Sequence, residues 1–541
     1  MGILTHVSVI LVMLATSLVM LSPFVNYSSF ASALHTGDGR VQAWVLAWVG
    51  HALGTGRPLF DANMLHPARA SLSHTDHMAT LGAIGAPIWW STGNAILEFN
   101  VLLLLGPALS AYAMFLLARD RTNDTAAAIV AGMAYGFSSF TLIHNAHLNL
   151  TWSAGLPLAI RGFERWWAVP SWTRLLGWWI PAVATALVSW YLALMLALLL
   201  AAWCVWLSVT ADRQLMSTRL VQLIAGTALA VSVMLPFLAP YFGRGSEAAE
   251  AAAFAASWQS YVVPSEHTVI GRWLVGRRIA SPQGFWGERT LFAGWTLLAL
   301  AAVGAATARG TRRRDVIFCS IITAVAVSLS FGPGPHGLAP FDLLARLPGV
   351  SGFRATARFA LLVIFALALL AAMGVSSVRQ RYPRVATATP MVLAILILFE
   401  VFVVDFPVGK PSPETPPEIY RLAVQDDARA AIALPMYSPE YEWYREGDYL
   451  LYSTTAGFLP LANGLGRWVP PEYLAIAEAS RGFPSPEAAA VLRHYGITHV
   501  LFHGARFGDR GPALLDRAAR GGDFSVVTTR GSDTLLRVIP R

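Results

Sequence analysis

The sequence predicts an α-helical polytopic membrane protein with about eleven transmembrane helices and a small soluble α/β domain at the C-terminus. Of its 541 residues, 55% are hydrophobic and only 13% are charged, and the mean hydropathy is +0.52. Soluble globular chains carry about 25% charged residues. Several uncharged runs, such as 220–240 and 359–376, are long enough to cross about 30 Å of hydrocarbon as helices. This composition argues against a soluble globular core.

Short clusters of arginine separate the apolar runs and set the predicted topology. They lie at Arg119 and Arg121, at 161–174, at Arg213 and Arg219, at 312–314 and at 379–384. Under the positive-inside rule such clusters face the cytoplasm. With a cytoplasmic N-terminus, the pattern predicts helices near 5–25, 96–118, 124–142, 144–160, 175–190, 191–209, 219–241, 290–308, 316–332, 357–377 and 386–406. This odd number of crossings places the C-terminus outside.

The net charge of +8 comes almost wholly from arginine, because Lys410 is the only lysine. This bias is typical of a GC-rich bacterial coding sequence, so we expect a bacterial inner-membrane protein. A basic chain can bind nucleic acid, but these arginines lie between apolar runs, where topology signals and lipid contacts belong. Nucleic acid is therefore not an expected partner. Cys204 and Cys319 lie inside apolar segments and resemble small buried hydrophobes rather than a disulfide or a metal site.

Three predicted loops face the outer side and should frame any active site. They span 26–97, 242–289 and 332–356. The first contains two helix-like pieces, 40–53 and 77–90, whose tryptophans suit the membrane–water interface. We expect these two pieces to lie along the membrane surface. Together with its loops, the transmembrane domain is predicted to cover 1–406.

The composition changes after Phe406, where five prolines within 407–417 indicate a stiff exit from the last helix. An extracytoplasmic domain is predicted to follow, at 407–541. Hydrophobic patterning predicts strands at 430–434, 497–503, 524–528 and 534–539, and helices at 486–495 and 512–520. The domain has no glycine-rich phosphate loop and no nucleophile elbow, which favours an accessory or acceptor-binding role over a second active site.

Asp38 lies in the first outer loop between Gly37 and Gly39. Flanking glycines leave the backbone pliable, which suits a carboxylate that must reach a substrate. The same aspartate could instead cap the helix that is predicted to start at Arg40. Local sequence alone favours the cap.

Several short motifs along the chain resemble those of one known superfamily. They are Gly37-Asp38-Gly39, Pro58-Leu59-Phe60-Asp61-Ala62-Asn63, Ser73-His74-Thr75-Asp76-His77, His144-Asn145-Ala146-His147-Leu148, Gly352-Phe353-Arg354-Ala355-Thr356-Ala357-Arg358-Phe359, Leu461-Ala462-Asn463-Gly464 and Phe483-Pro484-Ser485-Pro486. On these motifs the chain resembles the GT-C superfamily of polytopic glycosyltransferases, and within it bacterial proteins of the YfhO-like or uncharacterised glycosyltransferase kind. The resemblance implies a polyprenyl-phosphate sugar donor and a catalytic acid in the first outer loop. That role is carried over to Asp38.

Glycosyl transfer of this kind assigns roles to charged residues of the outer loops. An acceptor hydroxyl must lose its proton as it attacks the anomeric carbon, and we expect Asp38 to accept it. The departing lipid phosphate gains charge, which arginine stabilises well. Arg354 and Arg358 are four residues apart at the predicted start of a helix, hence on one face, and are candidates for this role. Their alternative role is contact with lipid headgroups. Arg289, beside Glu288, is a further candidate.

Two groups of histidines accompany these residues. His74, Asp76 and His77 share the first outer loop, and His144 and His147 are three residues apart near a predicted outer helix end. These side chains can contact substrate, and Asp76 could itself be the base. Imidazole and carboxylate together can hold Zn or Mn, or Mg through Asp76. The sequence points to no particular cofactor, and a divalent cation at His74, Asp76 and His77 stays an open alternative.

The leading hypothesis is transfer of a sugar from a polyprenyl-phosphate donor to a lipid-linked glycan, a cell-envelope polymer or a protein on the outer face. The expected partners are the donor, that acceptor and membrane lipid. One alternative is a transporter or flippase of a lipid-linked substrate, which should carry ionisable residues at mid-membrane depth. The predicted spans carry almost no carboxylates. A non-catalytic scaffold for cell-envelope assembly is the other alternative.

Overall fold

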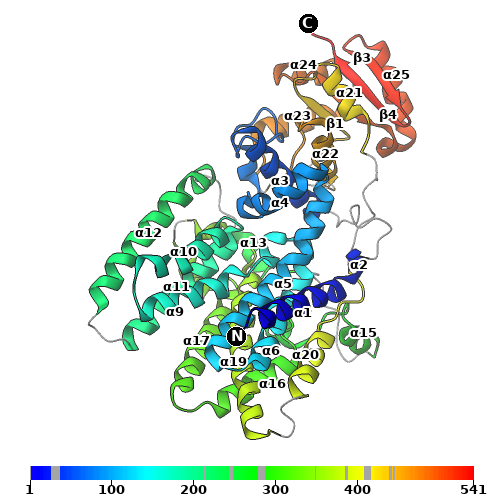
Figure 1. Ribbon diagram of the computed structural model, residues 1–541. Coiled ribbons are helices and arrows are strands. Elements are labelled where there is room, and N and C mark those ends of the chain that lie inside the picture. Colours follow the sequence, from blue (N-terminus) through cyan, green and yellow to red (C-terminus); the bar gives the residue numbers. More distant parts are fainter. Residues whose placement is uncertain are drawn as a thin grey trace. The chain divides into compact units, whose positions relative to one another are not determined.

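The computed structural model describes residues 2–25, 37–210, 215–242, 248–277, 287–347, 349–383, 388–406, 416–437, 442, 445–466 and 468–541 (Figure 1). The chain forms two compact units. Unit 1 consists of Met1–Asn26 and Leu102–Pro407, and unit 2 consists of Tyr27–Val101 and Val408–Arg541. Most of the predicted first outer loop therefore belongs to the same unit as the C-terminal segment. The proline-rich stretch 407–415 lies outside the described residues.

Unit 1 is helical. Its elements are α1 (Ile3–Met20), α2 (Ser22–Val25), α5 (Ala95–Thr122, which starts in unit 2), α6 (Thr125–Gly136), α7 (Ser139–Ile143), η3 (His144–Ala146), α8 (Leu148–Thr151), α9 (Gly155–Ala168), α10 (Trp172–Ala186), α11 (Trp190–Thr210), α12 (Met216–Leu238), η5 (Ala239–Tyr241), α13 (Ala248–Ala253), α14 (Trp258–Val262), α15 (Val269–Gly276), α16 (Trp295–Thr307), α17 (Thr311–Ser330), α18 (Pro340–Leu344), η6 (Val350–Gly352), η7 (Thr356–Phe359), α19 (Ala360–Arg381) and α20 (Thr389–Glu400).

Within the described residues, six helical segments are long and apolar enough to cross a membrane. They are Ile3–Met20, Ala95–Thr122, Thr125–Ala146, Trp190–Val209, Met216–Tyr241 and Thr356–Arg381. Two shorter apolar helices, Trp295–Thr307 and Thr389–Glu400, fall within predicted spans. The helical membrane class is confirmed, while the number of eleven crossings stays a prediction.

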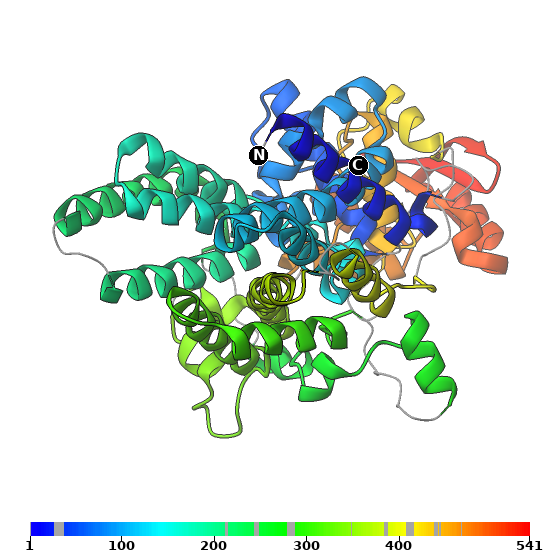
Figure 2. The same ribbon diagram turned by 60° about the horizontal axis from the view of Figure 1, so that its bottom comes forward.

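Helix α19 forms the centre of unit 1, because its apolar window is wholly buried inside the protein. It packs closely against α16, as Figure 2 shows. A Cβ atom placed on Gly304 of α16 would lie 2.1 Å from the Leu370 carbonyl oxygen, and one on Gly374 of α19 would lie 2.2 Å from the Leu300 carbonyl oxygen. The two glycines thus let the two backbones approach, as small residues do between membrane helices.

The sequence predicted two regular spans, at 124–142 and 144–160. A candidate span covers Thr125–Ala146, but it is interrupted, and the next long helix, α9, begins only at Gly155. Helix α6 ends at Gly136, and the Ser138 side chain caps the short α7 by accepting from the Thr141 N–H at 3.3 Å. The chain then passes through η3 and α8 before α9 begins. The Tyr135 hydroxyl donates to the Ser153 carbonyl at 3.1 Å across this stretch. Such internal bonds permit non-helical backbone in a membrane protein.

Unit 2 combines the two first-loop helices, α3 and α4, with an α/β domain. Its elements are α3 (Asp38–Thr55), η2 (Ser71–His74), α4 (Ala79–Thr92), α21 (Ile419–Gln425), β1 (Ala431–Leu434), α22 (Glu446–Ser453), η9 (Thr454–Ala456), α23 (Pro471–Arg481), α24 (Pro486–His494), β2 (His499–His503), η10 (Gly504–Arg510), α25 (Gly511–Arg520), β3 (Phe524–Arg530) and β4 (Asp533–Val538). The sheet order is β1-β2-β4-β3, with β1 and β2 parallel and the other pairs antiparallel. The small C-terminal α/β domain is confirmed.

Backbone hydrogen bonds join the first-loop segment to the C-terminal segment within unit 2. The Leu65 N–H donates to the Asn463 carbonyl, and the His66 N–H donates to the Leu461 carbonyl, each at 2.9 Å. In return the Leu461 N–H donates to the Asn63 carbonyl at 2.9 Å. Leu461 also bridges to Ala431 of β1. The first-loop segment therefore pairs with a strand-like stretch that itself lines the edge of the sheet.

Candidate active site

A buried polar cluster in unit 1 joins three segments that are far apart in sequence. Glu288 follows α15, Arg358 lies in η7, and His144 lies in η3. The Nε–H of Arg358 donates to both carboxylate oxygens of Glu288 at 3.1 Å, and its Nη2–H donates to Oε1 at 2.5 Å. His144 Nε2 lies 3.4 Å from Glu288 Oε2, and its Nδ1 lies 2.7 Å from the Phe140 carbonyl. The structure thus brings together the predicted residues His144 and Arg358, with Glu288 between them.

The charges of this cluster offset one another. Burial by itself would raise the pKa of Glu288, but the Arg358 guanidinium and His144 hold it well below its usual value. Glu288 is therefore ionised and compensates Arg358. The guanidinium also lies over the Tyr191 ring, 4.4 Å from its centroid. Since a bidentate carboxylate uses the planar fork of an arginine, little of Arg358 is left to bind a phosphate.

Arg354 and Arg289 have more accessible positions than Arg358. Arg354 is half-buried, with its guanidinium 5.3 Å from the centroid of the Phe254 ring. Arg289 is exposed and its Nη2–H donates to the Ala253 carbonyl at 2.9 Å. The two predicted phosphate ligands therefore lie beside adjacent residues at the end of α13. Arg354 does not share a helix with Arg358, as the sequence had suggested, because η7 begins at Thr356.

The remaining predicted residue of unit 1 is His147, which is half-buried between η3 and α8. Its ring lies 5.8 Å from that of His144 in an edge-on arrangement. Both histidines belong to the interrupted stretch after α6, rather than to the end of a continuous helix. This stretch therefore places His144 beside Glu288, with the His147 ring next to that of His144.

In unit 2, Asp38 is the first residue of α3 and is half-buried. The residue before it, Gly37, has φ of 62°, a left-handed conformation that glycine adopts at little cost. The helix macrodipole stabilises a negative charge at this end of the helix. The turn therefore presents a carboxylate at the start of an eighteen-residue helix.

The first-loop histidines are buried and hydrogen-bonded to backbone. His74 Nδ1 contacts the Trp468 carbonyl, and His77 Nδ1 accepts from the Ala79 N–H at 3.0 Å. Burial lowers the pKa of His77 to about 4, so its ring is neutral at pH 7. Asp76, between them in the sequence, is half-buried. In the described part of the chain no three His, Cys, Asp or Glu side chains are placed to hold a metal ion, so His74, Asp76 and His77 do not form a metal-ligand set.

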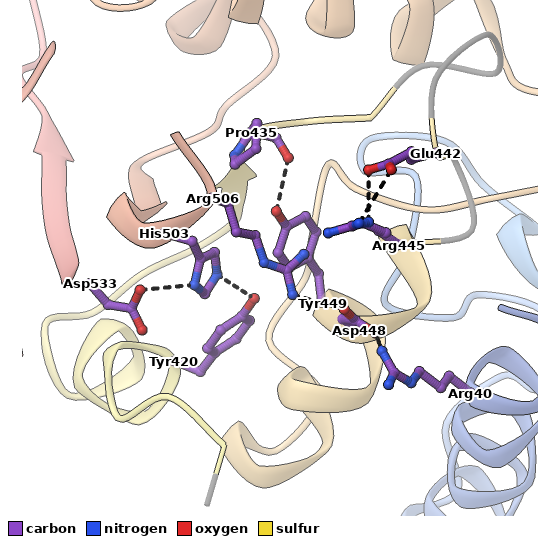
Figure 3. Close-up of polar contacts among 10 residues, drawn as sticks. All are labelled: Arg40, Tyr420, Pro435, Glu442, Arg445, Asp448, Tyr449, His503, Arg506 and Asp533. Carbon is purple, nitrogen blue, oxygen red and sulfur yellow. Dashed lines mark hydrogen bonds and ion pairs between the residues drawn. The ribbon is translucent and has the colours of Figure 1, made fainter. Parts of the chain in front are cut away.

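Sequence reasoning missed a second polar cluster in unit 2, shown in Figure 3. Asp448 on α22 pairs with Arg40 on α3, and its Oδ2 accepts from Arg506 Nη2 at 2.8 Å. The Arg506 guanidinium lies 4.7 Å from the centroid of the Tyr449 ring. Arg40 follows Asp38 by two residues, and this proximity was the only signal that the sequence offered. The cluster thus connects the helix of the predicted base to the C-terminal segment.

Aromatic and imidazole groups surround this ion-pair network (Figure 3). The His503 ring bonds to the Tyr420 hydroxyl at 3.1 Å and to Asp533 Oδ1 at 3.2 Å. It stacks on Tyr449, with 5.1 Å between ring centroids. Burial raises the pKa of Tyr420 and of Tyr449 and lowers that of His503. These three side chains are therefore uncharged at pH 7. Their rings line one side of the ion-pair network.

The family of the chain follows from its sequence. Residues 9–401 match the family described as "Domain of unknown function (DUF6311)". The chain belongs to the DUF6311 family. Comparison of this DUF6311 sequence with curated proteins gave no match.

Solved structures show which fold the DUF6311 protein has. It resembles the apo oligosaccharyltransferase of Archaeoglobus fulgidus, with a TM-score of 0.54 and 14% identity over 95% of this chain and 71% of that one. It also resembles the arabinofuranosyltransferase AftD from Mycobacteria, with a TM-score of 0.56 and 13% identity over 100% of this chain and 42% of that one. The DUF6311 protein is a multi-pass membrane protein with a GT-C-like fold.

Proposed function

We propose that this DUF6311 protein transfers a sugar from a polyprenyl-phosphate donor to an acceptor on the outer face of the bacterial inner membrane. The acceptor is a lipid-linked glycan, a cell-envelope polymer or a protein. The observation that carries the proposal is an aspartate, Asp38, at the first turn of a first-loop helix in a GT-C-like fold. The two similar structures are an oligosaccharyltransferase and an arabinofuranosyltransferase, which both transfer sugars.

In the proposed reaction Asp38 accepts the proton of the acceptor hydroxyl as that oxygen attacks the anomeric carbon. The bond from the anomeric carbon to the phosphate oxygen breaks, and the polyprenyl phosphate leaves with the electron pair. A carboxylate within hydrogen-bond reach is a suitable base for this step. Asp76, which is also half-buried in unit 2, is the second candidate for the base.

Arg354 and Arg289 are proposed to stabilise the charge on the leaving phosphate. Both are more exposed than Arg358 and lie beside adjacent residues of one segment. Arg358 is already compensated by Glu288. We assign to Arg358, Glu288 and His144 the role of holding the surrounding backbone. The half-buried His147 is proposed to contact substrate, whereas His74 and His77 are buried and hydrogen-bonded to backbone.

The experiment is a transfer assay with purified protein in lipid vesicles, a panel of polyprenyl-phosphate sugars and a lipid extract as acceptor. Loss of a general base typically lowers the rate by about 10²–10⁴-fold, and we expect this for Asp38→Asn. Asp61→Asn is the matched control, because this exposed aspartate of the same loop accepts the Ala70 N–H at 2.9 Å in a turn. Wild-type transfer that survives in Asp38→Asn but not in Asp76→Asn would move the base to Asp76.

Two further variants test the arginine assignment in the same assay. Arg354→Gln should raise the donor KM and lower kcat while leaving the melting temperature within a few degrees of wild type. Arg358→Gln should lower the melting temperature, because it leaves the buried Glu288 uncompensated. If no donor supports transfer but vesicles move a labelled lipid-linked sugar between leaflets, the transporter alternative replaces this proposal. If neither activity is found, a scaffold role replaces it.

A further inference from the structure

Helix α22 of the C-terminal segment begins against the first turn of α3. Gly447, the second residue of α22, makes this approach possible. A Cβ atom on Gly447 would lie 3.1 Å from Val41 Cγ2 and 3.6 Å from both Arg40 Cβ and the Gly37 carbonyl oxygen. The start of α22 therefore lies on the same turn that carries Asp38.

An ion-pair network fixes this contact (Figure 3). Asp448, the next residue of α22, pairs with Arg40 through Oδ1 and with Arg506 through Oδ2. The side chains of Arg40 and Asp448 are 12% and 9% exposed, so water screens their pairing only weakly. Arg506 comes from η10, directly after β2, and its stacking on Tyr449 holds the guanidinium in place. The Asp448 carboxylate thus bridges α3 and the segment that follows β2.

Arg40 and Asp38 belong to one rigid turn. The Arg40 N–H and the Val41 N–H both donate to the Gly37 carbonyl, at 3.0 and 3.3 Å. A rotation of Arg40 about the helix axis therefore rotates Asp38 as well. Whatever holds the Arg40 side chain in place therefore also restrains the backbone turn from which the Asp38 side chain projects.

We propose that Asp448 is a positioning residue for Asp38, acting through Arg40, so that the C-terminal segment sets the geometry of the base. This inference rests on the proposed function of Asp38. A reacting group displaced by about 1 Å can lose up to about 10²-fold in rate, because the attack geometry is lost. Removal of Asp448 should therefore lower kcat and leave the substrate KM nearly unchanged.

The test compares Asp448→Asn with a matched control in full-length protein. Asp523 is also a buried aspartate shared by two arginines, Arg493 and Arg541, in the same C-terminal domain. Asp523→Asn should lower stability by a similar amount without changing kcat. Asp448→Asn should lower kcat at least about tenfold, with the KM values within about twofold of wild type. Asp448→Glu, which keeps the charge, should recover part of the rate.

Amide hydrogen exchange gives a second readout that needs no activity. Exchange in a peptide covering the first turn of α3 should become faster in Asp448→Asn and stay at the wild-type rate in Asp523→Asn. Wild-type kcat in Asp448→Asn, or an equal fall of kcat in both variants, would overturn the inference, as would unchanged exchange. If Asp448→Asn does not fold, Arg40→Lys, which keeps the charge but loses the planar fork, takes its place.

The two proposals can fail separately. Full activity of Asp38→Asn removes the proposed base, and with it the positioning role, even where exchange shows that Asp448 holds the turn. Loss of activity in Asp38→Asn with normal kcat in Asp448→Asn removes the positioning role alone. Loss of kcat in both, with faster exchange in Asp448→Asn, supports both.

Discussion

The carboxylate of Glu288 receives two different N–H groups of the buried Arg358, Nε–H at 3.1 Å and Nη2–H at 2.5 Å. Removing one partner of a buried ion pair leaves the other charge uncompensated, which costs about 3–5 kcal/mol. We therefore expect Glu288→Ala to lower the melting temperature of the purified protein markedly. Replacing both partners in the double variant Glu288→Leu, Arg358→Met should bring the melting temperature back most of the way to the wild-type value.

Arg289→Ala is the control for that experiment, because Arg289 is adjacent in sequence but exposed. Its side chain donates to a backbone carbonyl at 2.9 Å instead of pairing inside the cluster. An equal loss of stability in Arg289→Ala and Glu288→Ala would contradict the prediction.

The close crossing of α16 and α19 predicts the effect of one added methyl group. Gly304→Ala would place a Cβ 2.1 Å from the Leu370 carbonyl oxygen, so the helices must separate. Overpacking of this kind costs about 1–3 kcal/mol, and thermal unfolding should show it. Gly177→Ala on α10 is the control, because a Cβ there meets no atom within 4 Å among the described residues. A Gly304→Ala protein as stable as Gly177→Ala would exclude the tight crossing.

The buried carboxyl group of Glu446 should make the free energy of unfolding fall as the pH rises. Burial raises its pKa to about 8, from the ordinary value of 4.5, although the Tyr437 N–H and the Gly464 N–H both donate to its carboxyl group. The folded state therefore holds this proton more tightly than the unfolded state does. Its contribution is complete below about pH 4.5 and is lost as the pH rises to about 8. The melting temperature of wild type minus that of Glu446→Gln should decrease across this window, and a constant difference would refute the assignment.

The buried imidazole of His77 should make the free energy of unfolding fall as the pH is lowered. Burial lowers its pKa from 6.5 to about 4, so the unfolded state binds the proton more tightly. Its contribution to stability is present above about pH 6.5 and is lost as the pH falls to about 4. His77→Gln keeps an acceptor for the Ala79 N–H and should remove this part of the acid sensitivity, measured as unfolding midpoints between pH 4 and 7. An identical acid profile in the variant would contradict the prediction.

The predicted orientation can be checked with reporter fusions. Alkaline phosphatase is active only outside the cytoplasm, and a fusion after Arg541 should be active. A fusion after Arg314, in the arginine-rich start of α17, should be inactive because such clusters stay in the cytoplasm. The reverse pattern would place Asp38 and the C-terminal domain inside and would exclude transfer on the outer face.

The sequence predicted well those features that depend on local pattern. The first-loop helix was expected at 40–53 and is found at Asp38–Thr55, and the four predicted strands correspond to β1–β4 within a few residues. These elements are encoded by hydrophobic periodicity and by glycine at the helix entry. Periodicity alone could not place Arg354, which was expected on the helix of Arg358. The Ala355 N–H donates to the Tyr191 hydroxyl and the Ala357 N–H to the Phe254 carbonyl, so neighbouring segments take the hydrogen bonds that would extend the helix.

Contacts between distant segments were not predictable from one sequence. Glu288 was noted only as the neighbour of Arg289, although it compensates Arg358, seventy residues away. Nothing in the sequence pointed to a role for Asp448, because its partner Arg40 is 408 residues distant. Neither spacing nor composition encodes such pairs.

The pairing of the first-loop segment with the C-terminal segment has a consequence for biogenesis. Asn63 and its partner Ser453 are 390 residues apart in the chain. At a synthesis rate of about 5–20 residues per second, the ribosome needs roughly 20–80 s to make the intervening chain. During that interval α3 and the first-loop segment after it lack the C-terminal surface on which they pack in the finished protein. Unit 2 can therefore form only after the chain has been made past Ser453, and a nonsense mutation before that residue would leave the helix of the proposed base without its support.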